Sequence, residues 1–174
     1  MRRAWASLAL VAAGCAGGER APEPQRVRQA PPPVVVRPLF AADYVAAAAS
    51  IDLFEMRSAE LALERAQDPR LREFARMMVA DHRGTSAQLS LAGRRLNLVP
   101  PAAMLPQHQA LYEALVAAAD FDPVYRSQQL TVHEAALKLH SDFAARGESP
   151  TLRPVAANAV PIVRRHLDQL RAIR

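Results

Sequence analysis

The sequence predicts an all-α protein, built as an antiparallel four-helix bundle with an additional short helix between the second and third long helices. Of the 174 residues, 51% are hydrophobic but only 5% are aromatic and six are glycine, a composition typical of helices packed through small side chains. From Leu39 onward, apolar residues recur at the 3.6-residue spacing of an amphipathic helix. Helix-start signals with proline follow at Asp68-Pro69, Asp122-Pro123 and Ser149-Pro150.

The first two long helices are expected to form a hairpin. Apolar residues such as Tyr44 and Phe54 mark one stripe of the first helix, and Asp68-Pro69 supplies an N-cap followed by proline at the first helical position of the second. The second helix should end near Asn97, because Pro100-Pro101 cannot continue it.

A connection from Asn97 to Phe121 leads to the third helix, and its middle, residues 107–119, is expected to form the short helix. His108 in this connection is expected to be exposed. The third helix should begin at Asp122-Pro123 and end at Gly147. The fourth should open at Ser149-Pro150 and carry an internal proline, Pro161, which implies a kink or an opened turn.

Residues 1–15 resemble a bacterial signal peptide. Arg2-Arg3 precede an apolar run over residues 4–13, which is too short to span a bilayer. Cys15 follows small residues as in a lipobox, where the cysteine is lipidated and becomes the mature N-terminus, and a lone thiol would otherwise have no disulfide partner after export. The sequence therefore predicts an exported, periplasmic protein anchored to the outer membrane through Cys15. Ordinary signal-peptide cleavage nearby is the alternative.

Residues 16–38 are rich in proline and arginine and lack apolar periodicity, so they are expected to form a semi-extended linker before the bundle domain, residues 39–174. The basic character of the chain comes largely from its start. Six of the 22 basic residues and two of the 17 acidic residues precede Leu39, so the bundle carries 16 basic and 15 acidic residues. Because duplex binding needs clustered basic side chains, no nucleic-acid partner is expected.

Four chemically active side chains fall within the apolar stripes, one on each long helix: Glu55, His82, His133 and His166. All four lie near the middle of their helices, so they are expected to converge in the core. One carboxylate and three imidazoles form a suitable ligand set for a transition metal such as Fe, Mn, Cu or Zn. The alternative is a buried hydrogen-bond network without metal. His140 and Met78 flank this level as secondary ligand candidates that also suit the core.

The sequence resembles a known bacterial family at a series of positions spread over the predicted bundle. These positions are Glu55, Leu61-Ala62, Ala66, Phe74-Ala75, Met78-Val79, Asp81-His82, Phe121-Asp122, Tyr125, His133, Pro161 and His166-Leu167. The string is similar to the domain of unknown function 4142 family over nearly all of residues 39–174. The resemblance implies a ferritin-like bundle in an exported, outer-membrane-associated protein. Its recurrent positions match Glu55, Asp81, His82, His133 and His166, and Asp81 would orient a metal-bound imidazole from the second shell.

Three functional hypotheses remain. The first is a metal-binding bundle of the cell envelope, and the second is a non-catalytic structural or partner-binding lipoprotein whose inward Glu and His residues form a core network. An enzyme is the least supported. The sequence has no Gly-rich phosphate loop and no serine-hydrolase motif. It also lacks the Glu-x-x-His pattern of di-iron bundles, so ferroxidase or oxygenase chemistry is not expected.

Overall fold

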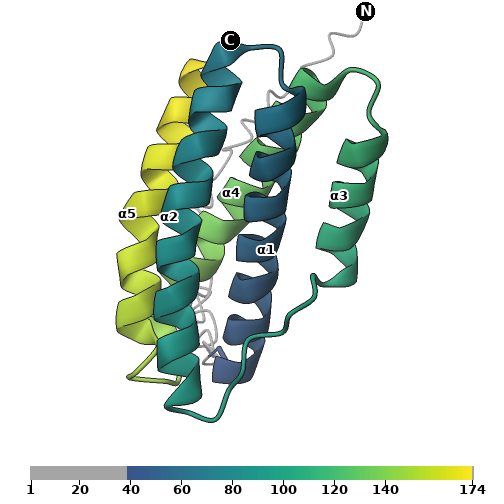
Figure 1. Ribbon diagram of the computed structural model, residues 1–174. Helices are drawn as coiled ribbons and strands as arrows, with labels where there is room; N and C mark the ends of the chain where they lie inside the picture. The colour runs from purple at the N-terminus through teal and green to yellow at the C-terminus, as the bar shows by residue number, and fades with distance from the viewer. Residues whose placement is uncertain (1–38, 174) are drawn as a thin grey trace, which may run out of the picture. The chain divides into compact units, whose positions relative to one another are not determined.

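A computed structural model describes residues 39–173 of the chain (Figure 1). The predicted signal segment, Cys15 and the whole predicted linker lie outside the described residues. The described part folds into four long helices and one short helix: α1 (Ala41–Arg65), α2 (Pro69–Arg94), α3 (Pro106–Ala117), α4 (Phe121–Arg146) and α5 (Arg153–Ala172). Within it, no helix is long and apolar enough to cross a membrane.

The four long helices close into a ring. Helix α1 packs on α2 and α4, and α5 packs on the same two helices, while α3 lies outside the ring against α1 and α4. The segment between α2 and α4 runs the length of the bundle, so α4 starts at the end where α2 also starts (Figure 1). One long crossover of this kind characterises ferritin-like bundles. The predicted fold class, with its extra helix, is confirmed.

Asp122 joins the start of α4 to the turn between α1 and α2. Its carboxylate accepts hydrogen bonds from the backbone N–H groups of Gln67, at 3.0 Å, and Asp68, at 2.8 Å. The prediction that Asp122 caps its own helix was wrong, because α4 begins at Phe121 with Asp120 at the N-cap position. The carboxylate instead satisfies donors that α1 and α2 leave free where they meet.

At the opposite end, the turn after α4 caps α1. The Glu148 side chain accepts a hydrogen bond from the Ala41 N–H at 2.9 Å, which supplies the cap that Phe40 cannot provide. Helix α5 begins at Arg153 and not at the predicted Ser149-Pro150, because Ser149 first closes a turn by accepting the Leu152 N–H. These contacts fix which ends of the helices adjoin.

The end of α2 depends on Gly93 and Asn97. The helix ends at Arg94, and a turn carries the chain to Asn97, whose φ of 57° lies in the left-handed region that asparagine tolerates. The Leu98 N–H bonds the Gly93 carbonyl at 2.9 Å, and a Cβ on Gly93 would lie 2.4 Å from the Leu98 carbonyl oxygen. Only glycine fits at this close approach.

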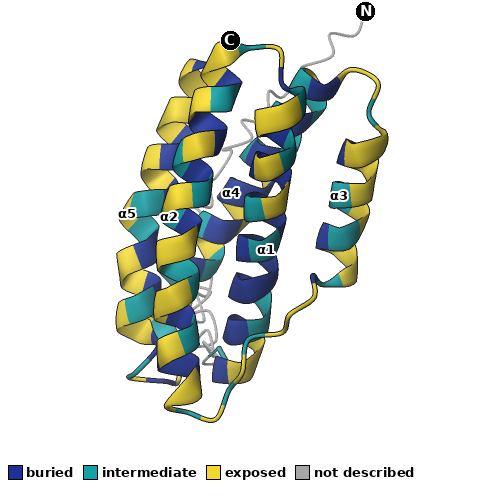
Figure 2. Cartoon of the chain, viewed as in Figure 1, coloured by how far each residue is buried: buried dark blue, intermediate teal, exposed yellow. Residues whose placement is uncertain are grey.

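The apolar core fills both ends of the bundle, and buried faces point inward from all four long helices (Figure 2). One end packs around Phe74, Met78 and Tyr125, and the other around Tyr44 and Phe143. A buried polar layer that contains Glu55 and three histidines lies between the two. Burial of these apolar side chains stabilises the fold and excludes water from the layer.

Helix α3 is held to α1 by two polar anchors. The Ser50 hydroxyl accepts the Leu105 N–H at 2.7 Å and lies 2.6 Å from His108 Nδ1, so His108 is buried and its predicted exposure was wrong. At the other end of α3, Arg65 donates to the carbonyls of Val116 and Ala118. The short helix therefore covers one side of the bundle in a fixed position.

Candidate metal centre

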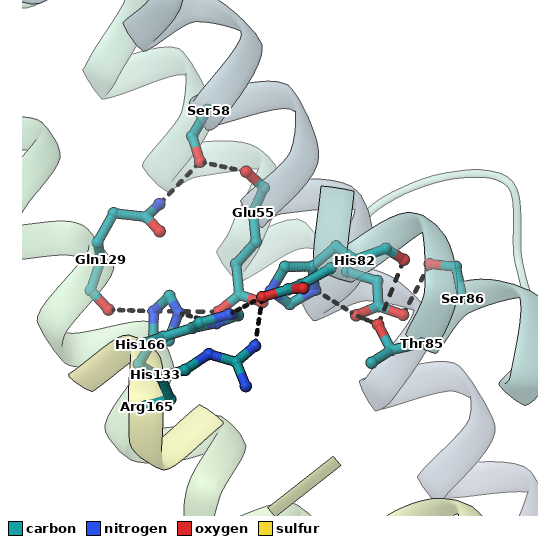
Figure 3. Close-up of polar contacts among 11 residues, drawn as sticks. Glu55, Ser58, His82, Thr85, Ser86, Gln129, His133, Arg165 and His166 are labelled. Atoms are coloured by element: carbon teal, nitrogen blue, oxygen red, sulfur yellow. Dashed lines mark hydrogen bonds and ion pairs between the residues drawn. The ribbon is translucent and has the colours of Figure 1, made fainter. Parts of the chain in front are cut away.

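Glu55 lies at the centre of the polar layer and is completely buried on α1. Its Oε2 lies 3.0 Å from His82 Nε2, and its Oε1 lies 3.2 Å from His133 Nδ1 (Figure 3). Burial raises the pKa of Glu55 to about 7, against a lowering by the His82 charge, and Asp52 raises it further. A carboxylate at such a depth requires a compensating charge.

His82 on α2 is fixed by Asp52 on α1. The two side chains meet at 2.8 Å between His82 Nδ1 and Asp52 Oδ1, and Ser86 donates to the other carboxylate oxygen at 2.7 Å. Nδ1 therefore carries a proton, and Nε2 points toward Glu55. Burial lowers the pKa of His82, but Glu55 and Asp52 outweigh it and raise the pKa to about 9.

His133 on α4 donates its Nδ1 proton to the carbonyl of Gln129, one turn earlier, at 2.7 Å. Its Nε2 is therefore unprotonated and faces His166 Nδ1 at 3.3 Å (Figure 3). Burial, followed by the neighbouring His166 and His82, lowers the pKa of His133 to about 3. This imidazole is neutral at physiological pH and offers a lone pair to the centre of the bundle.

His166 on α5 is held by Asp81 on α2. Its Nε2 donates to Asp81 Oδ2 at 2.8 Å, and Arg165 donates to the same oxygen at 2.6 Å. Partial burial raises the pKa of Asp81, but the hydrogen bonds from His166 and Arg165 outweigh it and lower the pKa overall. Burial lowers the pKa of His166 to about 4, which leaves Nδ1 as a second inward lone pair.

Each of the three imidazoles has one nitrogen hydrogen-bonded to an acceptor, namely Asp52 for His82, the Gln129 carbonyl for His133 and Asp81 for His166. One nitrogen from each lies within 4.8 Å of the other two, and atoms of Asp52, Glu55 and His82 form an overlapping group of the same size. Both Glu55 oxygens and His82 Nε2 are buried without a hydrogen bond, although they lie close together. Each of these two groups offers donors that suit a divalent transition-metal ion, and His82 belongs to both.

Sequence reasoning placed Glu55, His82, His133 and His166 together and put Asp81 beside them, but it missed Asp52. The available signal was the spacing: Asp52 precedes Glu55 by three residues, which places both carboxylates on one face of α1. The secondary candidates do not belong to either group of possible ligands. Met78 is fully buried in an apolar cluster, and His140 Nδ1 pairs with the Tyr44 hydroxyl at 3.0 Å.

The fold and this site define a class of protein, namely four-helix bundles with one long crossover and a Glu/His cluster buried near the middle of the long helices. The chain belongs to the family described as domain of unknown function (DUF4142), whose sequence model matches residues 28–173.

Solved structures of the protein CopM share the fold. The Cu(II)-bound form of CopM superimposes with a TM-score of 0.66 at 19% identity, over 78% of this chain and 96% of that one. The form without metal gives 0.64 at 19% identity, over 77% and 95% of the two chains. A silver-bound form obtained by co-crystallisation gives 0.63 at 19% identity, over 77% and 94%. No curated protein matches the sequence.

Proposed function

We propose that this bundle binds one divalent transition-metal ion in its core, with Glu55, His82, His133 and His166 as ligands. The observation that carries the proposal is the convergence of three imidazoles beside the buried Glu55 carboxylate. One nitrogen from each of His82, His133 and His166 lies within 4.8 Å of the other two, and each ring is held by an acceptor through a hydrogen bond. Metal-bound histidines are characteristically held by such outer acceptors, which fix the tautomer and raise ligand basicity.

The donor set favours Cu(II) and Zn(II) among the candidate metals Fe, Mn, Cu and Zn. Imidazole nitrogen suits both ions, whereas Mn(II) prefers oxygen-rich sites, and the general affinity order places Cu(II) highest. The copper- and silver-bound structures of CopM support a metal of this group, since they use the same fold at a low identity of 19%. We therefore propose that the site binds Cu(II) most tightly and that Zn(II) competes with it.

We further propose that the bundle works in the periplasm, tethered to the outer membrane by a lipid at Cys15. The support is the signal-like segment over residues 1–15 and the proline-rich linker after it. Metabolic labelling with a fatty acid should mark the wild-type chain but not a Cys15→Ser variant. Equal labelling of both would refute the anchor and leave the metal site unaffected.

The decisive test is elemental analysis of the bundle domain, residues 39–174, purified without a polyhistidine tag. The domain is exposed to Cu, Zn, Fe and Mn in turn, and loosely bound ions are removed. About one ion per chain should be retained, and a His82→Ala variant should lose it while keeping its helical circular dichroism. Retention of the metal in both His82→Ala and His166→Ala would exclude this site.

The competing function is a structural or partner-binding role in which the same residues form a core network. Its supporting observation is the proximity of His82 to both Glu55 and Asp52, because an imidazolium between two carboxylates is a self-sufficient arrangement. This alternative predicts no retained metal and a loss of stability alone when His82 is replaced. The elemental analysis therefore decides between the two functions.

A further inference from the structure

A narrow hollow leads from the surface toward the polar layer. Its residues come from α1, α2, α4 and α5, and they include Gln88 and Asn158 at the exposed rim and Asp52, Thr85 and His140 further in. The free interior measures about 10 Å³, which is close to the space that one water molecule occupies. The hollow therefore has room for a species the size of a water molecule or a single metal ion, but not for a metal ion held by a large chelator.

Asp52 connects this hollow to the candidate metal centre. Its carboxylate lines the hollow, and the same carboxylate receives the Nδ1 proton of His82, whose Nε2 faces Glu55. Atoms of Asp52, Glu55 and His82 lie within 4.8 Å of one another, so all three can approach one ion. A cation at Asp52 therefore lies beside His82, one of the proposed core ligands.

The hollow at Asp52 differs in charge from a second possible approach to the site, beside Asp81. Asp81 is also partly exposed beside the site, but the Arg165 guanidinium lies 2.6 Å from its carboxylate and repels an incoming cation. Among the described residues that line the hollow there is neither lysine nor arginine, and Asp52 supplies a negative charge. At the hollow, the only positive charge that the described residues place beside the carboxylate is that of the His82 ring, which can lose a proton, whereas the charge of Arg165 beside Asp81 is permanent.

We infer that metal ions enter the core through this hollow and bind Asp52 transiently before they reach the buried ligands. This inference rests on the proposed metal-binding function and adds to it an entry site that the four ligands do not include. In this scheme, Asp52 first holds the ion beside His82, and rotation of the imidazole then exchanges Asp52 for the inward ligands. The hollow controls the rate of loading, whereas the core residues control the affinity.

The test follows Cu(II) uptake by stopped-flow absorption, using the full-length chain in detergent with Cys15→Ser as the background, so that the thiol does not contribute. Asn158→Trp and Gln88→Trp place a large side chain over the rim. Their neighbours on the same helices, in Ala157→Trp and Ala87→Trp, are exposed but outside the hollow and serve as matched controls. The rim variants should load about tenfold or more slowly, with unchanged final stoichiometry, and the controls should match the background.

Each result has a defined meaning. Unaltered loading rates in both rim variants would overturn the entry route while leaving the metal site intact, since the background protein still takes up one ion. Faster loading in Arg165→Ala together with normal rates in the rim variants would place the entrance at Asp81 instead. If the background protein retains no stoichiometric Cu(II), the proposed function and the entry route are both overturned.

Discussion

His133 Nε2 and His166 Nδ1 face each other across 3.3 Å, and the outer hydrogen bonds of both rings leave these two nitrogens without protons. Two opposed lone pairs in a dry core repel unless a cation lies near them. A metal ion bound between these two nitrogens would therefore be favoured.

Metal binding should raise the thermal stability of the domain. At a free Cu(II) concentration of about 100 times Kd, linkage gives about 2.7 kcal/mol. For a domain of this size that corresponds to an increase in Tm on the order of 5–10 °C. Differential scanning calorimetry with and without Cu(II) measures the shift. In His166→Ala the shift should vanish, and a full shift in that variant would rule out His166 as a ligand.

Asp81→Ala should weaken metal affinity by about 10–100-fold, because it removes the acceptor that holds His166 Nε2 at 2.8 Å. The matched control is Arg165→Ala, which breaks the other, exposed contact of Asp81 and should change affinity by no more than a few fold. Competition with a chelator of known affinity measures both. Equal losses in the two variants would mean that the ion pair, and not the His166 contact, supports binding.

Metal affinity should increase with pH up to about pH 9. In the metal-free protein His82, whose pKa is raised to about 9, carries two ring protons at neutral pH, and a ligand nitrogen must lose one. Binding at pH 8 should therefore release about one proton per metal ion. Calorimetric titrations in buffers with different ionisation enthalpies count the released protons. Binding without proton release would contradict a role for His82 as a ligand.

The metal-free domain should lose stability as the pH falls from about 6.5 to 4. His140 has a pKa lowered to about 4 by burial, so across this range the unfolded chain binds a proton that the folded chain does not. Stability is therefore complete above the unfolded pKa and declines below it, by about 3 kcal/mol at most for this group. Urea denaturation at several pH values measures the decline. His140→Gln keeps a hydrogen-bonding partner for Tyr44 and should remove the share of His140 from the decline, whereas the shares of His133 and His166, whose pKa values are also lowered, should remain.

Ser50→Ala should destabilise the domain by about 1–3 kcal/mol, because it leaves the partly buried Leu105 N–H and the buried His108 ring without their partner. The loss should concentrate at the start of α3, where amide hydrogen exchange would accelerate. Thr131→Ala on the exposed face of α4 is a suitable control, since its hydroxyl bonds only a carbonyl of its own helix. Unchanged exchange in α3 would show that packing alone holds this helix.

The sequence by itself determined the helices and which faces they bury. Helix periodicity and the Asp68-Pro69 start signal depend on local geometry, so the stripes that carry Glu55, His82, His133 and His166 could be predicted, and the structure places those residues at one level. Several helix ends could not be predicted, because their caps come from distant parts of the chain. Asp122 caps the α1–α2 turn, and Glu148 caps α1.

Tertiary structure alone decided the partners of each side chain. His108 is buried because Ser50, far from it in the sequence, meets its ring, and Asp52 joins the site because α2 brings His82 beside it. The direction of each imidazole likewise depends on which acceptor lies outside it. Periodicity assigns a residue to a face, whereas hydrogen-bond geometry depends on positions to within an ångström, and only the packing of all five helices fixes those positions.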